Sequence, residues 1–206
     1  MTEYIVPYQD AESEFTEKRS RFITHLYKVE TEAEARARIE EMKKKYYDAR
    51  HNCWCYLLQE GGVVRYSDDG EPQGTAGQPM LNVFQRQEVW NVCCVVTRYF
   101  GGVLLGTGGL VRAYTTATSR ALEAAEVVTV RSVVALDVTV DYGLYERADL
   151  LIRAAGGKLA EPEFTDKVTL RWQMPEHTEG PLLTQLQELT RGTANVTVSE
   201  PFYAVF

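Results

Sequence analysis

Five glycines lie between residues 100 and 110, in the segment FGGVLLGTGGL. An apolar run precedes them and an amphipathic run follows, which is the layout of loops that hold phosphate between a strand and a helix. A helix start presents unpaired N–H groups and partial positive charge, and glycine lets a ligand approach the backbone closely. With Thr107 as the expected N-cap, the segment favours an anion. The residues concerned are Gly101, Gly102, Gly106, Thr107, Gly108, Gly109 and Arg112.

The same glycines also fit a purely structural role. The segment lacks the Gly-Lys-Ser/Thr ending of a Walker A loop, and its spacing from the preceding apolar run is not that of a dinucleotide-binding fingerprint. Glycine also allows a strand and a helix to pack tightly against each other. Both interpretations, an anion site and close packing, stay open from these residues alone.

Three carboxylates form a second candidate site. Asp68, Asp69 and Glu71 stand in SDDGEPQGTAGQP (67–79), together with glycines and prolines. Paired carboxylates can hold Mg²⁺ or share a proton, whereas Asp-Gly and Glu-Pro are also common in plain turns. The segment is long for a mere connection, and long ordered loops tend to carry sites.

Catalytic machinery is sparse. No Gly-x-Ser-x-Gly elbow occurs, and only three histidines are available as general bases. His51, Cys53 and Cys55 alternate along one expected strand, where the outer two would lie about 13 Å apart, too far to share a metal ion. Buried reduced thiols fit this pattern better than zinc. We therefore expect no catalytic residue, no metal and no cofactor, while enzymatic activity stays an open but less favoured alternative.

The composition is that of a soluble globular protein with a mild acidic excess. The 206 residues include 22 basic and 29 acidic side chains, a net charge of −7, which argues against binding nucleic acid by overall charge. Candidates for a local basic patch are Lys18, Arg19, Arg21, Lys43, Lys44, Lys45, Arg50, Arg98 and Arg112. No apolar stretch is long enough to span a membrane, and the N-terminus lacks a secretory signal. We expect a cytoplasmic protein without a membrane partner.

Periodicity predicts the elements that position these residues. Thr31 and Glu34 form a capping box at the start of one helix, and the nearly continuous apolar run 91–100 indicates a central strand buried on both faces. Strands are expected at 15–29 (one or two), 52–59, 63–67 and 91–100, and helices at 31–46, 79–87 and 108–125.

From about residue 131 the pattern starts afresh. It predicts a strand, a helix, two paired strands, a second helix and a last strand in the tail 195–206. This βαββαβ order is that of the ferredoxin-like fold. We therefore expect an α+β protein with a first domain at 1–131 and a second at 132–206.

Four runs resemble the IMPACT/YigZ family, in its bacterial two-domain form. They are EKRSRFITHL (17–26), ARHNCWCYLL (49–58), SDDGEPQGTAGQPML (67–81) and NVCCVVTRYFGGVLLGTGGLVRAY (91–114). The resemblance places the family's signature arginine and glycines on Arg98, Gly101, Gly102 and Gly106, with Tyr99 and Phe100 between them. It places the family's other loop motif on Asp68, Asp69, Gly70, Glu71, Gly74, Thr75 and Gly77. It covers the whole first domain, and the second domain is similar to the small C-terminal domain of bacterial members.

The resemblance implies a fold for each domain. The first would have the ribosomal-protein-like βαβ fold that a domain of elongation factor G shares with the GHMP small-molecule kinases. The second would be ferredoxin-like, similar to the C-terminal domain of that elongation factor. Eukaryotic members restrain a stress pathway of translation initiation by competing for a kinase activator, but their partner-binding RWD domain has no counterpart here.

Three hypotheses of function follow. The first is a non-enzymatic, translation-linked regulator that binds RNA or the ribosome, with Arg98 and Arg112 at phosphates and Tyr99 or Phe100 stacked on a base. The second is a small phosphate-ligand-binding protein or enzyme that uses the glycine-rich helix start and the carboxylate loop. The third is a protein-interaction module with a partner in the translation machinery.

Overall fold

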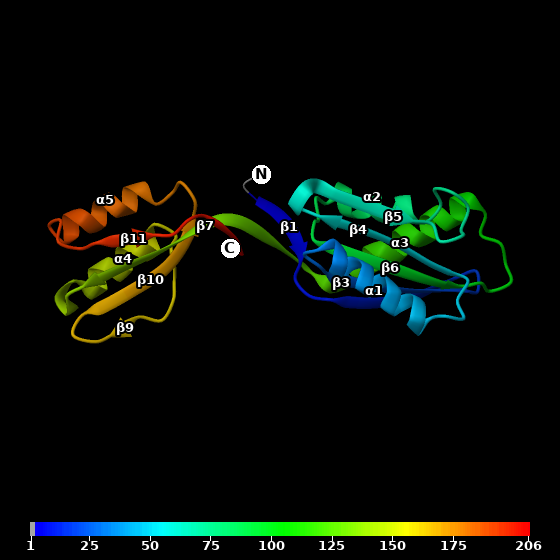
Figure 1. Cartoon of the computed structure of the whole chain (residues 1–206), viewed down its shortest axis with the longest axis horizontal. Coiled ribbons are helices and arrows are strands. Elements are labelled where there is room, and N and C mark those ends of the chain that lie inside the picture. Colours follow the sequence, from blue (N-terminus) through cyan, green and yellow to red (C-terminus); the bar gives the residue numbers. More distant parts are fainter. Residues whose placement is uncertain (1–2) are drawn as a thin grey trace. The chain divides into compact units, whose positions relative to one another are not determined.

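The computed structural model describes residues 3–206, which divide into two α+β units (Figure 1). The first unit comprises Tyr4–Thr129, and the second comprises Val130–Phe206 together with Glu3. The division falls inside one long strand, β7 (Val127–Val140), and not in a separate linker. Each unit has its own cluster of buried apolar side chains. The α+β class and the two-domain organisation predicted from the sequence are therefore confirmed.

The first unit is built on a five-stranded antiparallel sheet. A short strand, β1 (Glu3–Pro7), precedes it. The sheet strands, in spatial order, are β2 (Ala11–Glu17), β3 (Ser20–Lys28), β6 (Val92–Tyr99), β4 (His51–Leu58) and β5 (Val63–Ser67). β6 is central and buried on both faces, as its continuous apolar run predicts. The short 3₁₀ turn Glu60–Gly62 closes the expected hairpin between β4 and β5.

The expected strand region 15–29 forms two strands joined by a tight turn. Lys18 and Arg19 have φ angles of 44° and 68°, and Glu17 pairs with Ser20 across the turn. Two successive positive φ angles are typical of a two-residue hairpin turn that follows the twist of the strands. β3 also pairs with the central strand β6, and Arg21 near the start of β3 lies opposite Tyr99 at the end of β6. The basic turn therefore lies beside the C-terminal end of β6.

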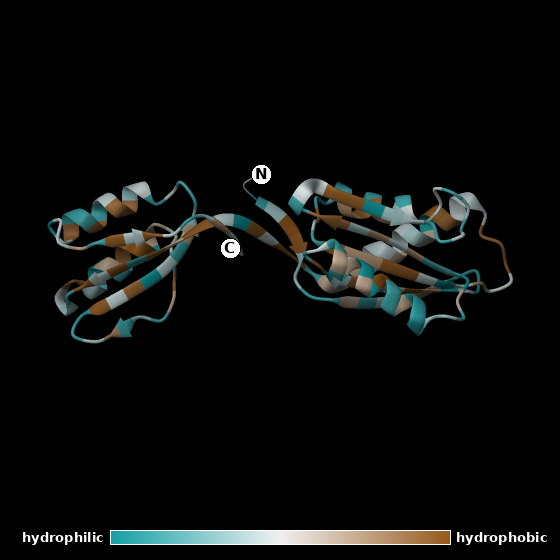
Figure 2. Cartoon of the chain, in the orientation of Figure 1, coloured by the Kyte–Doolittle hydropathy of each residue, from teal (hydrophilic) through white to brown (hydrophobic). Residues whose placement is uncertain are grey.

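Helices cover both faces of this sheet. α1 (Glu32–Lys45) begins at Thr31 with the expected capping box, and its Ile39 and Met42 pack on one face. α2 (Gly77–Arg86) and α3 (Thr107–Ala125) cover the other face, where the larger core lies. Apolar segments run along strands of the sheet, and the helices carry both apolar and polar segments (Figure 2). Within residues 3–206, no helix is both long and apolar enough to cross a membrane.

The second unit keeps the predicted order of strands and helices, but the first of the two paired strands expected between the helices is divided into two short strands. β7 is followed by the turn Tyr142–Leu144, α4 (Tyr145–Ala154), β8 (Lys158–Leu159), β9 (Glu163–Phe164), β10 (Val168–Pro175), α5 (Gly180–Leu189), β11 (Val196–Val198) and β12 (Phe202–Val205). β7 pairs with β10, which in turn pairs with β8 and β9, and all these pairs are antiparallel.

The tail differs from the single strand that the sequence predicts. It forms two short strands, β11 and β12, which both pair with β7. Between them the Ser199 N–H donates to the carbonyl oxygen of Ala135, and the Ser199 Oγ accepts from the Ala135 N–H. Pro201 has no N–H to contribute to the ladder, so the strand is interrupted there.

Candidate functional site

The carboxylate loop and the segment after β6 meet at a buried ion pair. Arg98, near the end of β6, donates from Nη1 to Oε1 of Glu71 at 2.7 Å, and the two side chains are only 7% and 3% exposed. The same carboxylate oxygen accepts a hydrogen bond from the Tyr114 hydroxyl of α3 at 2.8 Å. Residues distant in the sequence thus join the loop, the central strand and the helix.

Ser20 extends this arrangement to the glycine segment. Its Oγ lies 3.3 Å from both Nη2 of Arg98 and the N–H of Gly101. The rings of Phe22 and Phe100 lie against the guanidinium, with centroids 5.7 and 5.6 Å from its carbon. We call Arg98, Glu71, Tyr114 and Ser20 the Arg98 cluster.

The surroundings of Arg98 leave its guanidinium poorly placed for the phosphate contact expected from the sequence. The guanidinium is buried and already pairs with a carboxylate. A phosphate would have to displace Glu71 and move the rings that cover the cation. The structure therefore gives Arg98 a stabilising role, and a phosphate-binding role is not supported by its surroundings.

Asp68 and Asp69 hold the loop in place through backbone groups. The Asp68 carboxylate accepts hydrogen bonds from the N–H groups of Gly74, Ala76 and Gly77 at 2.8, 3.0 and 2.8 Å. The Asp69 carboxylate accepts from the N–H of Asn52 at 2.7 Å. The carboxylates thus make the contacts of an ordered turn, which is the alternative to a magnesium site that the sequence leaves open.

Thr75 and Gly77 complete the turn. The buried Thr75 hydroxyl donates to the carbonyl oxygen of Pro72 at 2.6 Å. A Cβ atom at Gly77 would lie 2.9 Å from the Ser67 backbone and 2.8 Å from the Tyr66 ring. Gly74 is exposed with a φ of 76°, a conformation that suits glycine. The small residues of this motif therefore serve close packing and turn geometry.

Removal of the Asp68 carboxylate should loosen the loop. Asp68→Ala leaves three N–H groups without their acceptor, and we expect the free energy of unfolding to fall by roughly 1–3 kcal/mol in urea denaturation. Asp68→Asn keeps one acceptor oxygen and should lose less. Glu123→Ala, an exposed acidic residue of α3, is the control, and an equal loss in Asp68→Ala and Glu123→Ala would show that Asp68 does not hold the loop.

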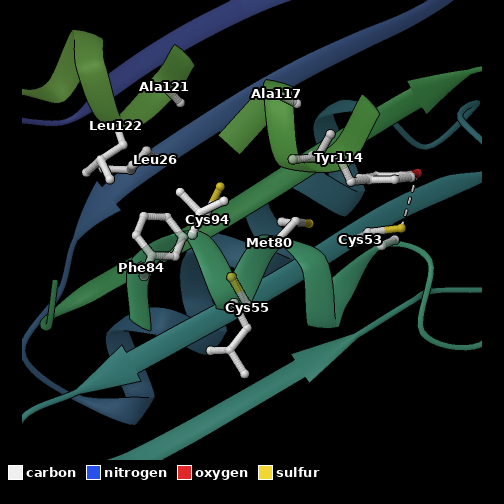
Figure 3. Packing of buried hydrophobic residues seen from close by; sticks show 14 of the residues in the cluster. Leu26, Cys53, Cys55, Met80, Phe84, Cys94, Tyr114, Ala117, Ala121 and Leu122 are labelled. Carbon is white, nitrogen blue, oxygen red and sulfur yellow. Dashed lines mark hydrogen bonds between the residues drawn. The ribbon is translucent and has the colours of Figure 1, made fainter. Parts of the chain in front are cut away.

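The candidate metal residues of β4 are also engaged within the protein. Nδ1 of His51 donates to the carbonyl oxygen of Asp69 at 2.9 Å, because a carbonyl can only accept. Sγ of Cys53 lies 2.9 Å from the carbonyl oxygen of Asp68 and 3.4 Å from the Tyr114 hydroxyl (Figure 3). Among residues 3–206, no three His, Cys, Asp or Glu side chains are arranged to hold a metal ion.

The four cysteines are buried and unpaired, as the sequence analysis expects. They are Cys53, Cys55, Cys93 and Cys94. Burial raises the pKa of the Cys94 thiol to about 12 and raises that of the Cys53 thiol further above its ordinary value. Because the thiolate is the nucleophilic form, these side chains behave as small apolar groups of the core.

Tyr99 is partly buried at the end of β6. Its hydroxyl donates to a carboxylate oxygen of Asp48 at 2.7 Å. This hydrogen bond favours the protonated phenol and raises the pKa of Tyr99 to about 12. By contrast, Phe100 is 46% exposed and begins a loop that also exposes Val103 and Leu104. This loop is the apolar segment between β6 and α3 in Figure 2.

The start of α3 differs from the expectation in its cap. The N-cap is Gly106, whose φ of 72° requires a left-handed backbone, and Thr107 is the first helical residue with no capping side chain. The expected N-cap role of Thr107 is therefore wrong, because the turn needs glycine at the capping position. The first intrahelical bond joins the N–H of Leu110 to the carbonyl of Gly106. The N–H groups of the three residues before Leu110 have no intrahelical acceptor.

A basic groove lies between α3 and the end of the β2–β3 hairpin. It has a volume of about 530 Å³, and its lining includes Lys18, Arg112 and Arg120 but only one acidic side chain, Glu17. Lys18, Arg112 and Arg120 are exposed, and no ion pair of theirs occurs in the described part of the chain. Of the candidate site residues, Arg112 lines this groove, and Gly106, Thr107 and Gly108 lie at the adjoining helix start.

Several lining residues were not identified from the sequence, and two of them are Phe15 and Arg120. They lie on β2 and α3, about one hundred positions apart, and neither belongs to a motif. The helical spacing of Gly109, Arg112, Thr116 and Arg120 is a signal that places them on one side of α3. Only the packing of α3 beside the edge strand β2 brings Phe15 next to them.

The comparisons with known proteins cover both units. Residues 18–122 match the family model of the Impact N-terminal domain, and residues 138–193 match a domain of unknown function, DUF1949. The chain is similar to the IMPACT family member YvyE of Bacillus subtilis, with 35% identity over 97% of this chain and 93% of the relative. It also matches the Protein IMPACT homolog of Dictyostelium discoideum, with 40% identity over 44% of this chain and 27% of that protein.

A solved structure supports the same fold. It is described as the crystal structure of an hypothetical protein, and it shares 30% sequence identity with a TM-score of 0.61. The superposition covers 97% of this chain and 98% of that structure's chain.

Proposed function

The chain belongs to the IMPACT family, and we propose that it is a non-enzymatic, translation-linked regulator of the cytoplasm that binds RNA or the ribosome. The basic groove of the first unit carries this proposal. The chain as a whole is acidic, with a net charge of −7, yet three cations that form no ion pair within residues 3–206 line one groove. Cations gathered against the net charge of a protein are the arrangement expected of a phosphate-binding surface.

In this proposal the two sequence motifs have separate roles. Arg112 and the start of α3, with Gly106, Thr107 and Gly108, contact phosphate through a guanidinium and through backbone N–H groups. The carboxylate loop and the Arg98 cluster hold β6, α3 and the hairpin turn in the arrangement that forms the groove. Gly101 belongs to the second group because its N–H bonds to Ser20 Oγ and its backbone lies close to Arg19 of the hairpin turn. Gly102 follows it in the loop that leads from β6 to α3.

The folds of the two units are part of the proposal. The first unit has strands and helices that fit the ribosomal-protein-like fold expected from the family resemblance, and the βαββαβ order of the second fits a ferredoxin-like fold. Two domains similar to parts of an elongation factor would suit a ribosomal binding site. Since fold alone does not determine function, the groove and not the fold is the surface to be tested.

An exposed apolar loop favours a second candidate function, a protein-interaction module. Leu104 is 82% exposed, and Phe100 and Val103 beside it are 46% and 39% exposed. Exposed apolar side chains that lie together commonly mark a contact with another protein. A protein partner in the translation machinery would bind here, next to the basic groove.

Co-sedimentation with ribosomes over a series of salt concentrations tests the proposed function. We expect the wild-type chain to pellet at low salt and to be released as salt rises. The double variant Lys18→Ala with Arg112→Ala should pellet much less, and its salt slope should fall by about two, one for each lost phosphate contact. Its melting temperature should stay unchanged because both side chains are exposed.

Arg86→Ala is the matched control, since Arg86 is an exposed arginine at the end of α2, outside the groove. It should pellet like the wild type. Two results would contradict the proposal: a wild-type chain that does not pellet at any salt concentration, or a double variant that pellets as well as the wild type. In the first case, a rise in melting temperature with a nucleotide or inorganic phosphate would favour the small phosphate ligand instead.

A further inference from the structure

Two phenylalanines and one arginine form a stacked arrangement along one side of the basic groove. The rings of Phe15 and Phe22 are stacked, with centroids 5.1 Å apart and planes inclined by 14°. The guanidinium carbon of Arg120 lies over the Phe15 ring, 5.0 Å from its centroid. Phe22 belongs to the buried core, whereas Arg120 is exposed. The stack therefore runs from the core of the first unit out to the groove.

This stack holds a planar cation at the groove surface. An exposed arginine side chain is ordinarily free to sample many rotamers, but a contact with an aromatic ring restricts it. In the described part of the chain, no ion pair draws Arg120 away from Phe15. A guanidinium plane is a surface on which a nucleobase can stack, as bases do on arginine in RNA-binding proteins.

The other cations of the groove are distributed along its length. Arg112 and Arg120 are eight positions apart on α3, which corresponds to about 12 Å along the helix axis. Thr116 lies between them, and Lys18 faces them from the hairpin turn. Charges spread in this way fit an extended polyanion better than a single phosphate group.

The volume of the groove limits the form that such a polyanion can take. A space of about 530 Å³ between a helix and a hairpin holds a nucleotide or two, not a double helix. In a duplex the bases are stacked inside, so that none could reach Arg120, whereas a single strand offers both its phosphates and its base faces.

We propose that the basic groove binds a single strand of RNA, with one base stacked on the Arg120 guanidinium and the adjoining phosphates at Arg112 and Lys18. This inference rests on the proposed function and adds to it the form of the nucleic acid and the base-contacting residue. Phe15 is a positioning residue that supports Arg120 from below. The start of α3 lies at the Arg112 end of the groove and receives the phosphate next in line.

Fluorescence anisotropy with the full-length chain tests the inference. One probe is a fluorescein-labelled single-stranded oligoribonucleotide of about eight nucleotides. The other is the same labelled strand paired with its complement as an RNA duplex. We expect the single strand to bind at least about tenfold more tightly than the duplex. Arg120→Lys keeps the charge but removes the planar surface, and it should weaken single-strand binding by roughly 5- to 150-fold, the range for the loss of one stacked base.

The salt dependence separates stacking from charge. Arg120→Lys should leave the salt slope unchanged because the positive charge is kept, whereas Arg112→Ala should reduce the slope by about one. Arg86→Lys is the matched control and should bind like the wild type. The melting temperature of Arg120→Lys should equal that of the wild type, so that a loss of binding cannot be attributed to unfolding.

Failure of this inference is distinguishable from failure of the proposed function. Equal binding of duplex and single strand, or unchanged binding by Arg120→Lys, would refute a stacked base at Arg120. If ribosomes still pellet the wild-type chain and not the double variant, the proposed function stands and only the single-strand inference is wrong. If the wild-type chain binds neither oligonucleotide nor ribosomes, both proposals are wrong.

Discussion

Arg98→Ala should lower the melting temperature of the first unit by on the order of 10 °C or more. The substitution leaves the Glu71 carboxylate, whose side chain is only 3% exposed, buried without its cation. Removal of one partner of a buried ion pair costs about 3–5 kcal/mol. In a domain of this length, such a loss lowers the melting temperature by on the order of 10 °C or more. Thermal unfolding followed by circular dichroism and tryptophan fluorescence measures the shift.

Glu71→Gln provides the comparison for this prediction. It removes the negative charge but keeps an oxygen that accepts from Arg98 and Tyr114, so the loss should be smaller. The double variant should be less destabilised than the sum of the single variants, with a coupling energy of about 0.5–3 kcal/mol, because the pair acts as a unit. Unchanged melting in Arg98→Ala, with a loss of RNA binding alone, would instead favour the phosphate contact suggested by the sequence.

Gly101→Ala should also destabilise the first unit strongly. A Cβ atom at this position would lie 2.0 Å from both the carbonyl carbon and the carbonyl oxygen of Arg19. These are backbone atoms, so no side-chain rotation can relieve the clash. The Lys18–Arg19 turn must shift away from β6, and the hydrogen bond from the Gly101 N–H to Ser20 would be lost. We expect a loss at or above the upper end of the roughly 1–3 kcal/mol typical of overpacking.

The same substitution should weaken nucleic-acid binding, because Lys18 belongs to the displaced turn and lines the basic groove. Gly102→Ala is the matched control. Gly102 has a φ of 82°, but a Cβ atom there would meet no described residue beyond its two chain neighbours within 4 Å. Alanine at this position therefore meets only backbone strain of about 1–2 kcal/mol. Urea denaturation and oligonucleotide binding of the two variants give the comparison. Equal stability of the two would show that close packing against Arg19 is not the reason for glycine at position 101.

The residues of the motifs and of the groove fall into two groups with different expected effects. Arg98 and Glu71 pair in the interior, and the half-buried Gly101 packs against the backbone of Arg19. Arg112, Lys18 and Arg120 lie on the surface and make no ion pair in residues 3–206. Substitutions in the first group should lower stability, with a loss of binding only where the groove is displaced, and those in the second should weaken binding without a change in stability.

The order of the helices and strands follows largely from local patterns in the chain. The capping box of Thr31 and Glu34 marks the start of α1 because the capping interactions are local. The apolar run that forms β6 and the βαββαβ order of the second unit follow from periodicity, which depends on neighbours along the chain. The sequence also placed Lys18 and Arg112 among the candidates for a basic patch. It did not place the break of the tail into β11 and β12, which depends on how residues 195–206 pair with β7.

Which of the candidate residues are free to bind a ligand depends on contacts between distant segments of the fold. Glu71 lies 27 positions from Arg98, and nothing local to either residue specifies that the two meet in the interior. Phe15 and Arg120 are farther apart still, and their contact depends on β2 being the edge strand beside α3. Local patterns specify backbone periodicity, whereas contacts between distant side chains depend on strand order, register and helix placement. For this reason the sequence identified charged residues, and the fold separated those that stabilise it from those that face the groove.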